Sequence, residues 1–462
     1  MLLRRVLVLV AALALAACGG APLAEQANGP AAPALPTAAP PSRETIALPP
    51  TQPPASTAIP PTQPPTPTAL APTQPPATML PAASFGSEIL FLRKRALIAF
   101  DTATRKERQL ADGVIDFAAT PDGSLIALVR APVSDVDLWV VRRDGGGLRQ
   151  LTDDGNQRVE AVPDWAPDGA AIVYASSNTS DHYTRTWPSW SEWCEASEVH
   201  VLNVADDAMQ SFGPGCDPAF SPDGKRIAYT SLPTIRQAGG HSRNAGNTIR
   251  LINRQGQNGW DFAAADGGTG ENPAKSGLLV YAPAWSPDGQ QIVYHRFLGY
   301  QALVDLDLTE IAGSFDGKGQ PLDSGSGWLL PARFASDRQA LAITENNPGD
   351  ARGFGGYDNW AVTVTSLNGT REIALPTGAL TAVGQRVDRL PRGQAAAWSP
   401  DGATLAVELP PGWNANLTPD QPVDADGQPG EIWRWQPGSA PAELLVQGVD
   451  FASPLAWLAA TQ

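Results

Sequence analysis

Short apolar runs that end in polar, turn-forming residues dominate the chain from Ser84 onward. The stretch Phe220–Ser231 (FSPDGKRIAYTS) is typical, because a strand end, a tight turn and a new strand follow one another in it. Proline fixes φ for the turn, aspartate can bond its own backbone, and glycine takes the left-handed position that closes the hairpin. We therefore expect an all-β fold.

Near-copies of this hairpin recur along the chain, one of them degenerate. They span Ala119–Gly123, Trp165–Gly169, Phe220–Gly224, Trp285–Gly289, Phe334–Arg338 (the degenerate copy) and Trp398–Gly402. A strand follows each turn, then a second apolar strand, and often a polar turn and a short fourth strand. An internal repeat of four strands is the signature of a β-propeller blade.

The repeated hairpin resembles the WD40-like repeat of TolB-type β-propellers, in which an aromatic-Ser-Pro-Asp-Gly turn joins the first two strands of a blade. The resemblance covers nearly all of residues 84–462, and its specificity comes from the recurrence, since a single hairpin is common. It implies a propeller fold. It implies little about function, because this fold carries unrelated activities.

The two ends of the repeat region indicate how the ring closes. Ser87–Arg93, Ala96–Asp101 and Glu107–Leu110 have the pattern of strands two, three and four of a blade that lacks its first strand. The tail Val449–Leu455 is expected to supply that strand, which removes an exposed sheet edge. This closure favours seven four-stranded blades, and six blades, familiar in TolB-type propellers, remain the alternative.

The N-terminal region has a different composition. Residues 1–17 combine Arg4 and Arg5 with a short apolar run, and Leu15-Ala16-Ala17-Cys18 resembles a bacterial lipobox, which predicts a cleaved signal and a lipidated Cys18. The alternatives are a plain secretory signal or a membrane span, although the run is short for a span.

Residues 18–84 are rich in Pro, Ala and Thr and contain PPTQPP repeats. They predict a disordered stalk, or alternatively a Pro-rich recognition segment. Residues 85–462 are expected to form the propeller domain.

The net charge and the cysteines restrict the possible binding partners and the cellular location of the protein. The formal net charge of −15 argues against binding nucleic acid or an anionic membrane surface. Cys194 and Cys216 lie in a domain expected outside the cytoplasm, where pairing is the default, so we expect a disulfide, with two buried thiols as the alternative. The predicted location is the cell envelope, on the outer side of a bacterial membrane.

The longest insertions are predicted on the face opposite the Asp-Gly turns. They are Ser176–Ser197, Ser231–Asn247, Glu345–Asn359 and Leu409–Gly430. The first contains the candidate ligand-binding residues Tyr183, Trp187, Trp190 and Trp193. Exposed aromatic rings of this kind bind sugar rings or protein side chains, unless they pack into a core of the loop itself.

Metal chemistry and catalysis receive less support from the sequence. His182, His241 and His295 are the candidate metal ligands, since all three were expected near the insertion face, and the related oligogalacturonate lyases use a histidine-rich metal site. Their spacing matches no metal motif, and Asp424–Gly427 lacks the glutamate of a calcium loop. The chain has no Gly-x-Ser-x-Gly elbow and no phosphate-binding glycine loop.

These observations favour a binding protein without a cofactor over an enzyme. The hypothesis is a lipid-anchored scaffold that recognises a protein or a cell-envelope glycan through the insertion face. The alternative is a metal-dependent polysaccharide lyase or hydrolase that uses the same face.

Overall fold

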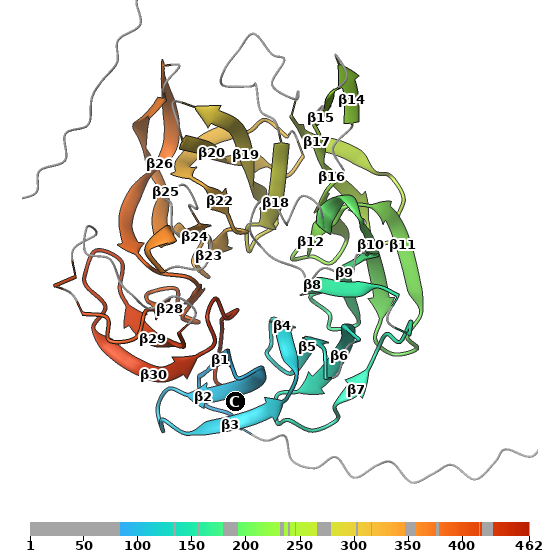
Figure 1. Cartoon of the computed structure of the whole chain (residues 1–462), viewed down its shortest axis with the longest axis vertical. Coiled ribbons are helices and arrows are strands. Elements are labelled where there is room, and N and C mark those ends of the chain that lie inside the picture. Colours follow the sequence, from blue (N-terminus) through green and yellow to red (C-terminus); the bar gives the residue numbers. More distant parts are fainter. Residues whose placement is uncertain are drawn as a thin grey trace, which may run out of the picture. The chain divides into compact units, whose positions relative to one another are not determined.

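The structure is a computed structural model, and it describes most of residues 84–461. The gaps are residues 133–134, 156, 179–192, 232–234, 239–240, 245, 266–278, 302–303, 316, 347–356, 376–377, 415 and 418–427. The predicted signal, Cys18 and the Pro-rich segment lie outside the described residues. Within the described part, seven sheets follow one another around a ring, so the chain is a seven-bladed β-propeller (Figure 1).

Blades 1 to 3 follow the chain in order. Blade 1 is β4 (Val114–Ala119), β5 (Leu125–Arg130), β6 (Asp137–Arg142) and β7 (Arg149–Gln150). Blade 2 is β8 (Val159–Trp165), β9 (Ala171–Ser177), β10 (Ser197–Asn203) and β11 (Met209–Pro214). Blade 3 is β12 (Cys216–Phe220), β13 (Arg226–Thr230), β16 (Thr248–Asn253) and β17 (Trp260–Ala264).

Blades 4 to 6 continue the same order, and blade 5 has a divided inner strand. Blade 4 is β18 (Leu279–Trp285), β19 (Gln291–Gln301), β20 (Val304–Gly313) and β21 (Gln320–Ser326). Blade 5 is β22 (Trp328–Leu329) with β23 (Arg333–Phe334), then β24 (Ala340–Asn346), β25 (Trp360–Leu375) and β26 (Gly378–Pro391). Blade 6 is β27 (Ala396–Trp398), β28 (Leu405–Leu409), β29 (Gly430–Trp435) and β30 (Glu443–Val449).

Blade 7 joins the two ends of the described chain. Its strands are β31 (Ala456–Leu458), β1 (Glu88–Arg93), β2 (Ala96–Asp101) and β3 (Glu107–Ala111). Leu458 pairs with Glu88 and Ala456 with Leu90, so the last strand of the chain is the inner strand of the blade that begins it. The predicted seven blades and the closure by both termini are confirmed.

The predicted position of the closing strand, Val449–Leu455, is wrong, because the strand that closes the ring is β31 (Ala456–Leu458). Val449 is the last residue of β30, and the Ser453 amide donates to the Asp450 carbonyl in a turn that precedes β31. The Asp450 carboxylate accepts the Lys94 and Arg95 amides at 2.6 and 2.7 Å. This turn anchors the chain to the β1–β2 hairpin. Residues 450–455 therefore connect β30 to the hairpin, and the closing strand begins only at Ala456.

The Asp-Gly turns have the conformation that their sequence predicts. In the turn after β12, Gly224 has φ +67°, its amide donates to the Ser221 carbonyl at 2.8 Å, and Asp223 accepts the Ser221 hydroxyl at 2.6 Å. The degenerate turn in blade 5 keeps this shape, because Arg338 itself has φ +62° and donates to Ala335. The left-handed position that favours glycine is therefore retained without it.

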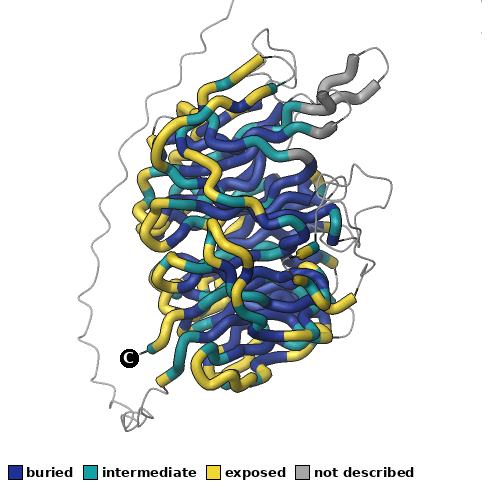
Figure 2. Tube along the Cα trace, turned by 90° about the vertical axis from the view of Figure 1, so that its left-hand side faces the viewer, coloured by how far each residue is buried: buried dark blue, intermediate teal, exposed yellow. Residues whose placement is uncertain are grey.

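The core is divided among seven apolar clusters that lie within and between blades. Figure 2 shows the buried chain in the interior and the exposed chain at the outer turns. Helix is almost absent from the part of the chain that the structure describes, which has one 3-10 turn at η1 (Tyr357–Asn359) and a short helical turn at residues 193–195. Among the described residues, none of the helical segments has the length and apolar character of a membrane span.

A buried arginine holds both ends of the described chain. Arg143, which follows β6, is 2% exposed, and its guanidinium donates to the Gly86 and Ala459 carbonyls, each at 2.7 Å. Its Nε donates to the Glu88 carboxylate at 2.8 Å. Since Gly86 precedes β1 and Ala459 follows β31, one side chain from blade 1 fixes the seam where the ring closes.

Candidate binding face

Four blades connect their second strand to their third by long insertions, and the ends of these insertions lie at one rim of the propeller. The facing pairs that flank them are Ser177 with Ser197, Thr230 with Ile249, Asn346 with Trp360, and Leu409 with Glu431. The Asp-Gly turns join the first strands to the second strands, so they lie at the opposite rim. We call these the insertion rim and the turn rim.

The second insertion is more regular than its sequence suggests. It contains a two-stranded hairpin, β14 (Ile235–Ala238) and β15 (His241–Asn244), in which Ala238 pairs with His241. His241 is therefore the first residue of a strand beside the hairpin turn. Its side chain lies outside the description, so its predicted role as a metal ligand stays a prediction.

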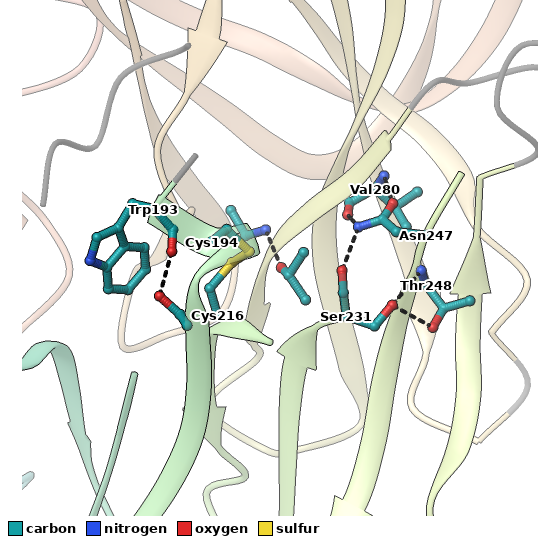
Figure 3. The surroundings of a disulfide bond; sticks show 10 residues. Trp193, Cys194, Cys216, Ser231, Asn247, Thr248 and Val280 are labelled. Atoms are coloured by element: carbon teal, nitrogen blue, oxygen red, sulfur yellow. Dashed lines mark hydrogen bonds between the residues drawn. A yellow bond between two sulfur atoms is a disulfide. The ribbon is translucent and has the colours of Figure 1, made fainter. Parts of the chain in front are cut away.

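A disulfide fixes the end of the first insertion (Figure 3). Cys194 and Cys216 are bonded with their Cα atoms 5.3 Å apart, and both side chains are buried. Cys216 is the first residue of β12, so the bond links blade 2 to blade 3. The predicted disulfide is confirmed.

Trp193, next to this bond, packs inward. Its side chain is 2% exposed and shares an apolar cluster with Cys194 and Ala161, and its carbonyl accepts the Ser197 hydroxyl at 2.6 Å. For this residue the structure agrees with the alternative in which the loop packs on itself. The other candidates of this insertion lie outside the described residues, and they are His182, Tyr183, Trp187 and Trp190.

The base of the second insertion is locked to the neighbouring blade (Figure 3). The Asn247 amide donates to the Ser231 carbonyl at 3.1 Å and to the Val280 carbonyl at 2.8 Å. In return, the Val280 amide donates to the Asn247 side-chain oxygen at 2.8 Å. Asn247 thereby spans from blade 3 to β18 of blade 4, so the insertion rests on a fixed support.

His295 lies in the interior of blade 4, which corrects the prediction that it ends a strand and points to the insertion face. It sits in the middle of β19, is fully buried, and contacts Thr309 through Nδ1 (3.1 Å) and the Leu330 carbonyl through Nε2 (2.9 Å). Nε2 must donate to the carbonyl, so Nδ1 accepts the hydroxyl proton. Burial lowers the pKa of His295 to about 4, which keeps the ring neutral.

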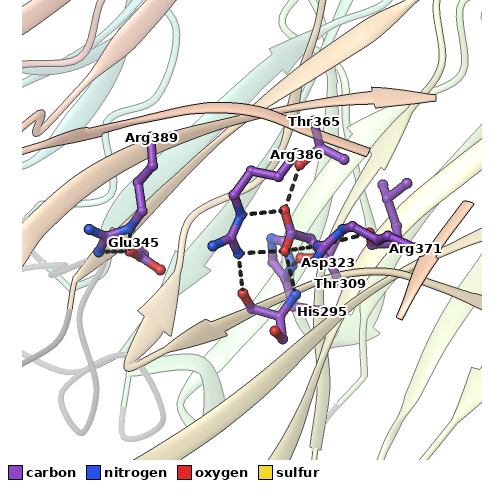
Figure 4. Close-up of polar contacts among 10 residues, drawn as sticks. His295, Thr309, Asp323, Glu345, Thr365, Arg371, Arg386 and Arg389 are labelled. Carbon is purple, nitrogen blue, oxygen red and sulfur yellow. Dashed lines mark hydrogen bonds and ion pairs between the residues drawn. The ribbon is translucent and has the colours of Figure 1, made fainter. Parts of the chain in front are cut away.

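A charged network near His295 joins blade 4 to blade 5 (Figure 4). Asp323, on β21, is 2% exposed and accepts hydrogen bonds from Arg371, from Arg386 at 2.6 Å and from the Thr365 hydroxyl at 2.5 Å. These three donors from blade 5 surround a carboxylate of blade 4, so removing one of them would leave a buried acceptor without its partner. No pattern in the sequence predicts this network, since its members are far apart along the chain and belong to no motif.

A second ion pair stands at the base of the third insertion. Arg389 of β26 donates to Glu345, the penultimate residue of β24, with its Nε 2.8 Å from the carboxylate (Figure 4). Glu345 is 6% exposed. Like Asn247 in blade 3, this pair fixes the strand end from which an insertion leaves.

Metal binding finds no support within the described part of the chain. There, no three His, Cys, Asp or Glu side chains are arranged to hold a metal ion. Both ring nitrogens of His295 are engaged by Thr309 and Leu330. The expected site would need His182 and the side chain of His241, which are not described, so that site stays a prediction.

The similarities of this chain to known proteins are distant. No protein-family model matches the sequence. No curated protein matches it either. A protein of unknown function from Desulfotomaculum acetoxidans is 12% identical, with 81% of this chain and 99% of that chain covered and a TM-score of 0.49. TolB from Acinetobacter baumannii is 13% identical, with 79% of each chain covered and a TM-score of 0.39.

A third similar structure is an enzyme. Oligogalacturonate lyase from Vibrio parahaemolyticus is 10% identical, with 68% of this chain and 80% of that chain covered and a TM-score of 0.46. At these identities the likeness concerns the fold alone. The sheets of the structure make the chain a seven-bladed β-propeller, and the structures similar to it include TolB and a lyase.

Proposed function

We propose that this chain is a lipid-anchored extracytoplasmic propeller that binds a protein or a cell-envelope glycan through its insertion rim. The observation that carries the proposal is the position of the four long insertions, whose ends share one rim of a closed ring. Long connections on a rigid scaffold are where binding sites concentrate.

The supports of the insertions strengthen this proposal. The Cys194–Cys216 disulfide, the bridge through Asn247 and the Glu345–Arg389 pair each fix a strand end from which an insertion leaves or to which it returns. Loops with fixed ends lose less conformational entropy when a ligand orders them. The first insertion also contains Trp187 and Trp190, residues of the type that dominates binding energy at interfaces.

The anchor is proposed from the sequence Leu15-Ala16-Ala17-Cys18. Radiolabelled fatty acid fed to cells that express the full chain should label the protein, and the label should disappear in Cys18→Ala. Membrane fractionation of both proteins is the second readout. Equal labelling of both proteins would show that the anchor is elsewhere or absent.

The binding function is tested with the full chain on a glycan array and in pull-down from envelope extracts. A specific ligand should be retained by the unaltered chain and lost by Trp187→Ala/Trp190→Ala. The lyase or hydrolase alternative makes the opposite prediction. A stoichiometric transition metal that is lost in His182→Ala/His241→Ala, together with degradation of a polysaccharide, would replace the binding proposal.

A further inference from the structure

A cluster of carboxylates lies at the insertion rim between blades 1 and 2. Val136 pairs with Val159 in an isolated parallel bridge, and the Glu160 amide donates to the Val136 carbonyl at 3.3 Å. This pairing brings Asp137, the first residue of β6, beside Glu160 in β8. The loop between β7 and β8 places Asp153 and Asp154 close enough to act electrostatically on Asp137, and Asp154 acts on Glu160 as well. We call Asp137, Asp153, Asp154 and Glu160 the carboxylate cluster.

Glu160 is buried without a full set of partners. Its side chain is 3% exposed, and its Oε1 accepts the Ser176 hydroxyl at 3.3 Å. Its Oε2 is buried and accepts no hydrogen bond from any described residue, and the same holds for Oδ2 of Asp154. By contrast, both Asp137 oxygens are occupied, by Gln150 and Thr152. Two buried carboxylate oxygens of this cluster therefore have no donor among the described residues.

Two arginines near the carboxylate cluster, Arg158 and Arg130, bind other groups. Arg158 donates to the Ser176 hydroxyl and carbonyl at 2.7 and 2.6 Å, and its guanidinium is 4.0 Å from Glu198. Arg130 faces Asp137 across the β5–β6 pair, but its guanidinium binds Asp112 at 2.5 Å and lies over the Trp139 ring.

The other titratable groups that the structure describes around the cluster do not supply a positive charge. His200 of β10 is 3.5 Å from Glu198, and burial lowers the pKa of its ring, so it is neutral at pH 7. Tyr174 of β9 is buried beside Glu160, and burial raises the pKa of its hydroxyl, which also stays neutral. Asp135, which precedes β6, adds a further acid next to Asp137. The cluster has an excess of acid among the described residues.

We propose that the carboxylate cluster receives a lysine or arginine side chain of a protein partner. This inference rests on the proposed binding function and names the chemistry that the insertion rim recognises beside the first insertion. An ammonium or guanidinium group has three or five donors, so it can satisfy several carboxylate oxygens at once, and its aliphatic stem can pass over apolar surface. Asp153 is exposed and Asp154 is partly exposed, which leaves the cluster open to solvent on the loop side.

A bound cation would change the proton content of the cluster. Burial, with Asp154 and Asp137 nearby, raises the pKa of Glu160 to about 8, so the free protein holds a proton there at pH 7. A cation favours the charged carboxylate and should displace that proton. Binding at pH 7 should therefore release on the order of one proton, whereas a salt-screened surface contact would release none.

The test is calorimetric titration of the full chain with a heptalysine peptide at pH 7 and low salt, in two buffers of different ionisation enthalpy. We expect Glu160→Gln to weaken binding at least fivefold and to abolish proton release, and Asp154→Asn to weaken binding as well. Asp206→Asn removes an acid at the turn rim and should leave both quantities within twofold of the unaltered chain. Equal affinity and proton release in Glu160→Gln, or binding of Ca²⁺ without binding of the peptide, would overturn the inference.

The outcome is separable from that of the proposed function. If a partner from the pull-down is lost by Trp187→Ala/Trp190→Ala but unaffected by Glu160→Gln, the binding face stands and the carboxylate cluster is not its cation site. If heptalysine binding depends on Glu160 while no partner depends on the tryptophans, the cation site stands and the proposed aromatic site fails.

Discussion

Glu160 is one side chain whose buried position makes the free energy of unfolding depend on pH. The structure buries its carboxyl group, leaves Oε2 without a donor from the described residues, and thereby raises its pKa to about 8. In the unfolded chain the same group titrates near 4.5. Between these two values the folded protein holds a proton that the unfolded chain has lost. Stability is therefore lost as pH rises from about 4.5 to about 8.

Replacing Glu160 by Gln should remove this loss. The variant should unfold at higher urea concentration than the unaltered chain at pH 8, with a gain on the order of 2 to 4 kcal/mol, and the gain should shrink toward pH 5. Asp137, whose pKa burial raises to about 6, is present in both proteins, so its own titration contributes to both stability curves. A gain that is the same at pH 5 and pH 8 would show that Glu160 titrates normally in the folded state.

The Asp-Gly turns should matter for stability and not for binding. A side chain at Gly224 would sit at φ +67° with its Cβ 3.2 Å from Pro167, so Gly224→Val should cost about 2 to 4 kcal/mol. Gly412→Val is the matched control, because Gly412 has φ +70° and no described atom lies within 4 Å of the position of its Cβ. It should cost about 1 kcal/mol. Urea denaturation of both variants measures the difference, and equal losses would mean that the Pro167 contact does not matter.

For single residues, the sequence predicts a role when that role depends on near neighbours in the chain or on simple rules such as cysteine pairing. The conformation of Gly224 follows from its four-residue turn, and the Cys194–Cys216 bond follows from the number and location of the cysteines. The roles of His295 and Asp323 do not follow, because Leu330 and Arg386 reach them only through the packing of blade 4 against blade 5. A lone histidine in a strand gives no sequence signal that separates a buried neutral ring from a metal ligand.

At the scale of elements, the Cys194–Cys216 disulfide is the one covalent cross-link between side chains in the described part of the chain. It joins residues 22 positions apart and connects the first insertion to blade 3. Restricting a loop of this length in the unfolded chain stabilises the fold by about 3 kcal/mol. Cys194→Ser/Cys216→Ser should lower the free energy of unfolding by that amount, and reductant should have the same effect on the unaltered chain. Identical denaturation curves with and without reductant would contradict the prediction.

Strand positions were predictable where a strand is long and flanked by clear turns. β1 and β2 agree with the predicted Ser87–Arg93 and Ala96–Asp101 within one residue. β31 was misplaced because it has three residues, and because Asp450 anchors the preceding turn by accepting distant amides of the β1–β2 hairpin. No local pattern reveals such a contact between opposite ends of the chain. The β14–β15 hairpin was missed for a similar reason, since its strands have four residues each.

For the whole molecule, ring closure depends on the seam in blade 7. Arg143 is the point where blade 1 binds both ends of the seam, through Gly86, Ala459 and Glu88. Arg143→Met should cost about 3 to 5 kcal/mol, because it leaves two carbonyls without their donor and leaves the buried Glu88 with Arg108 as its remaining ion-pair partner.

The neighbouring Arg142 provides the control for this prediction. It is exposed and pairs with Asp144 two residues away, so Arg142→Met should change stability by less than about 1 kcal/mol. Chemical denaturation gives both values. Limited proteolysis adds a second readout, since an opened seam should expose the C-terminal strand β31 to cleavage in Arg143→Met alone. Equal stability of the two variants would show that the seam does not depend on this arginine.

The central claim is that the turn rim is scaffold and the insertion rim binds. The most direct test measures the affinity of the pulled-down partner for two double variants of the full chain. Trp187→Ala/Trp190→Ala alters the first insertion, and Leu148→Ala/Phe315→Ala removes two exposed apolar side chains near the turn rim, which are 40% and 75% exposed. This division of roles predicts that the tryptophan pair weakens binding by roughly 2 to 4 kcal/mol with an unchanged melting temperature, and that the turn-rim pair leaves affinity within twofold. Loss of affinity in the turn-rim pair, with the tryptophan pair binding normally, would contradict it.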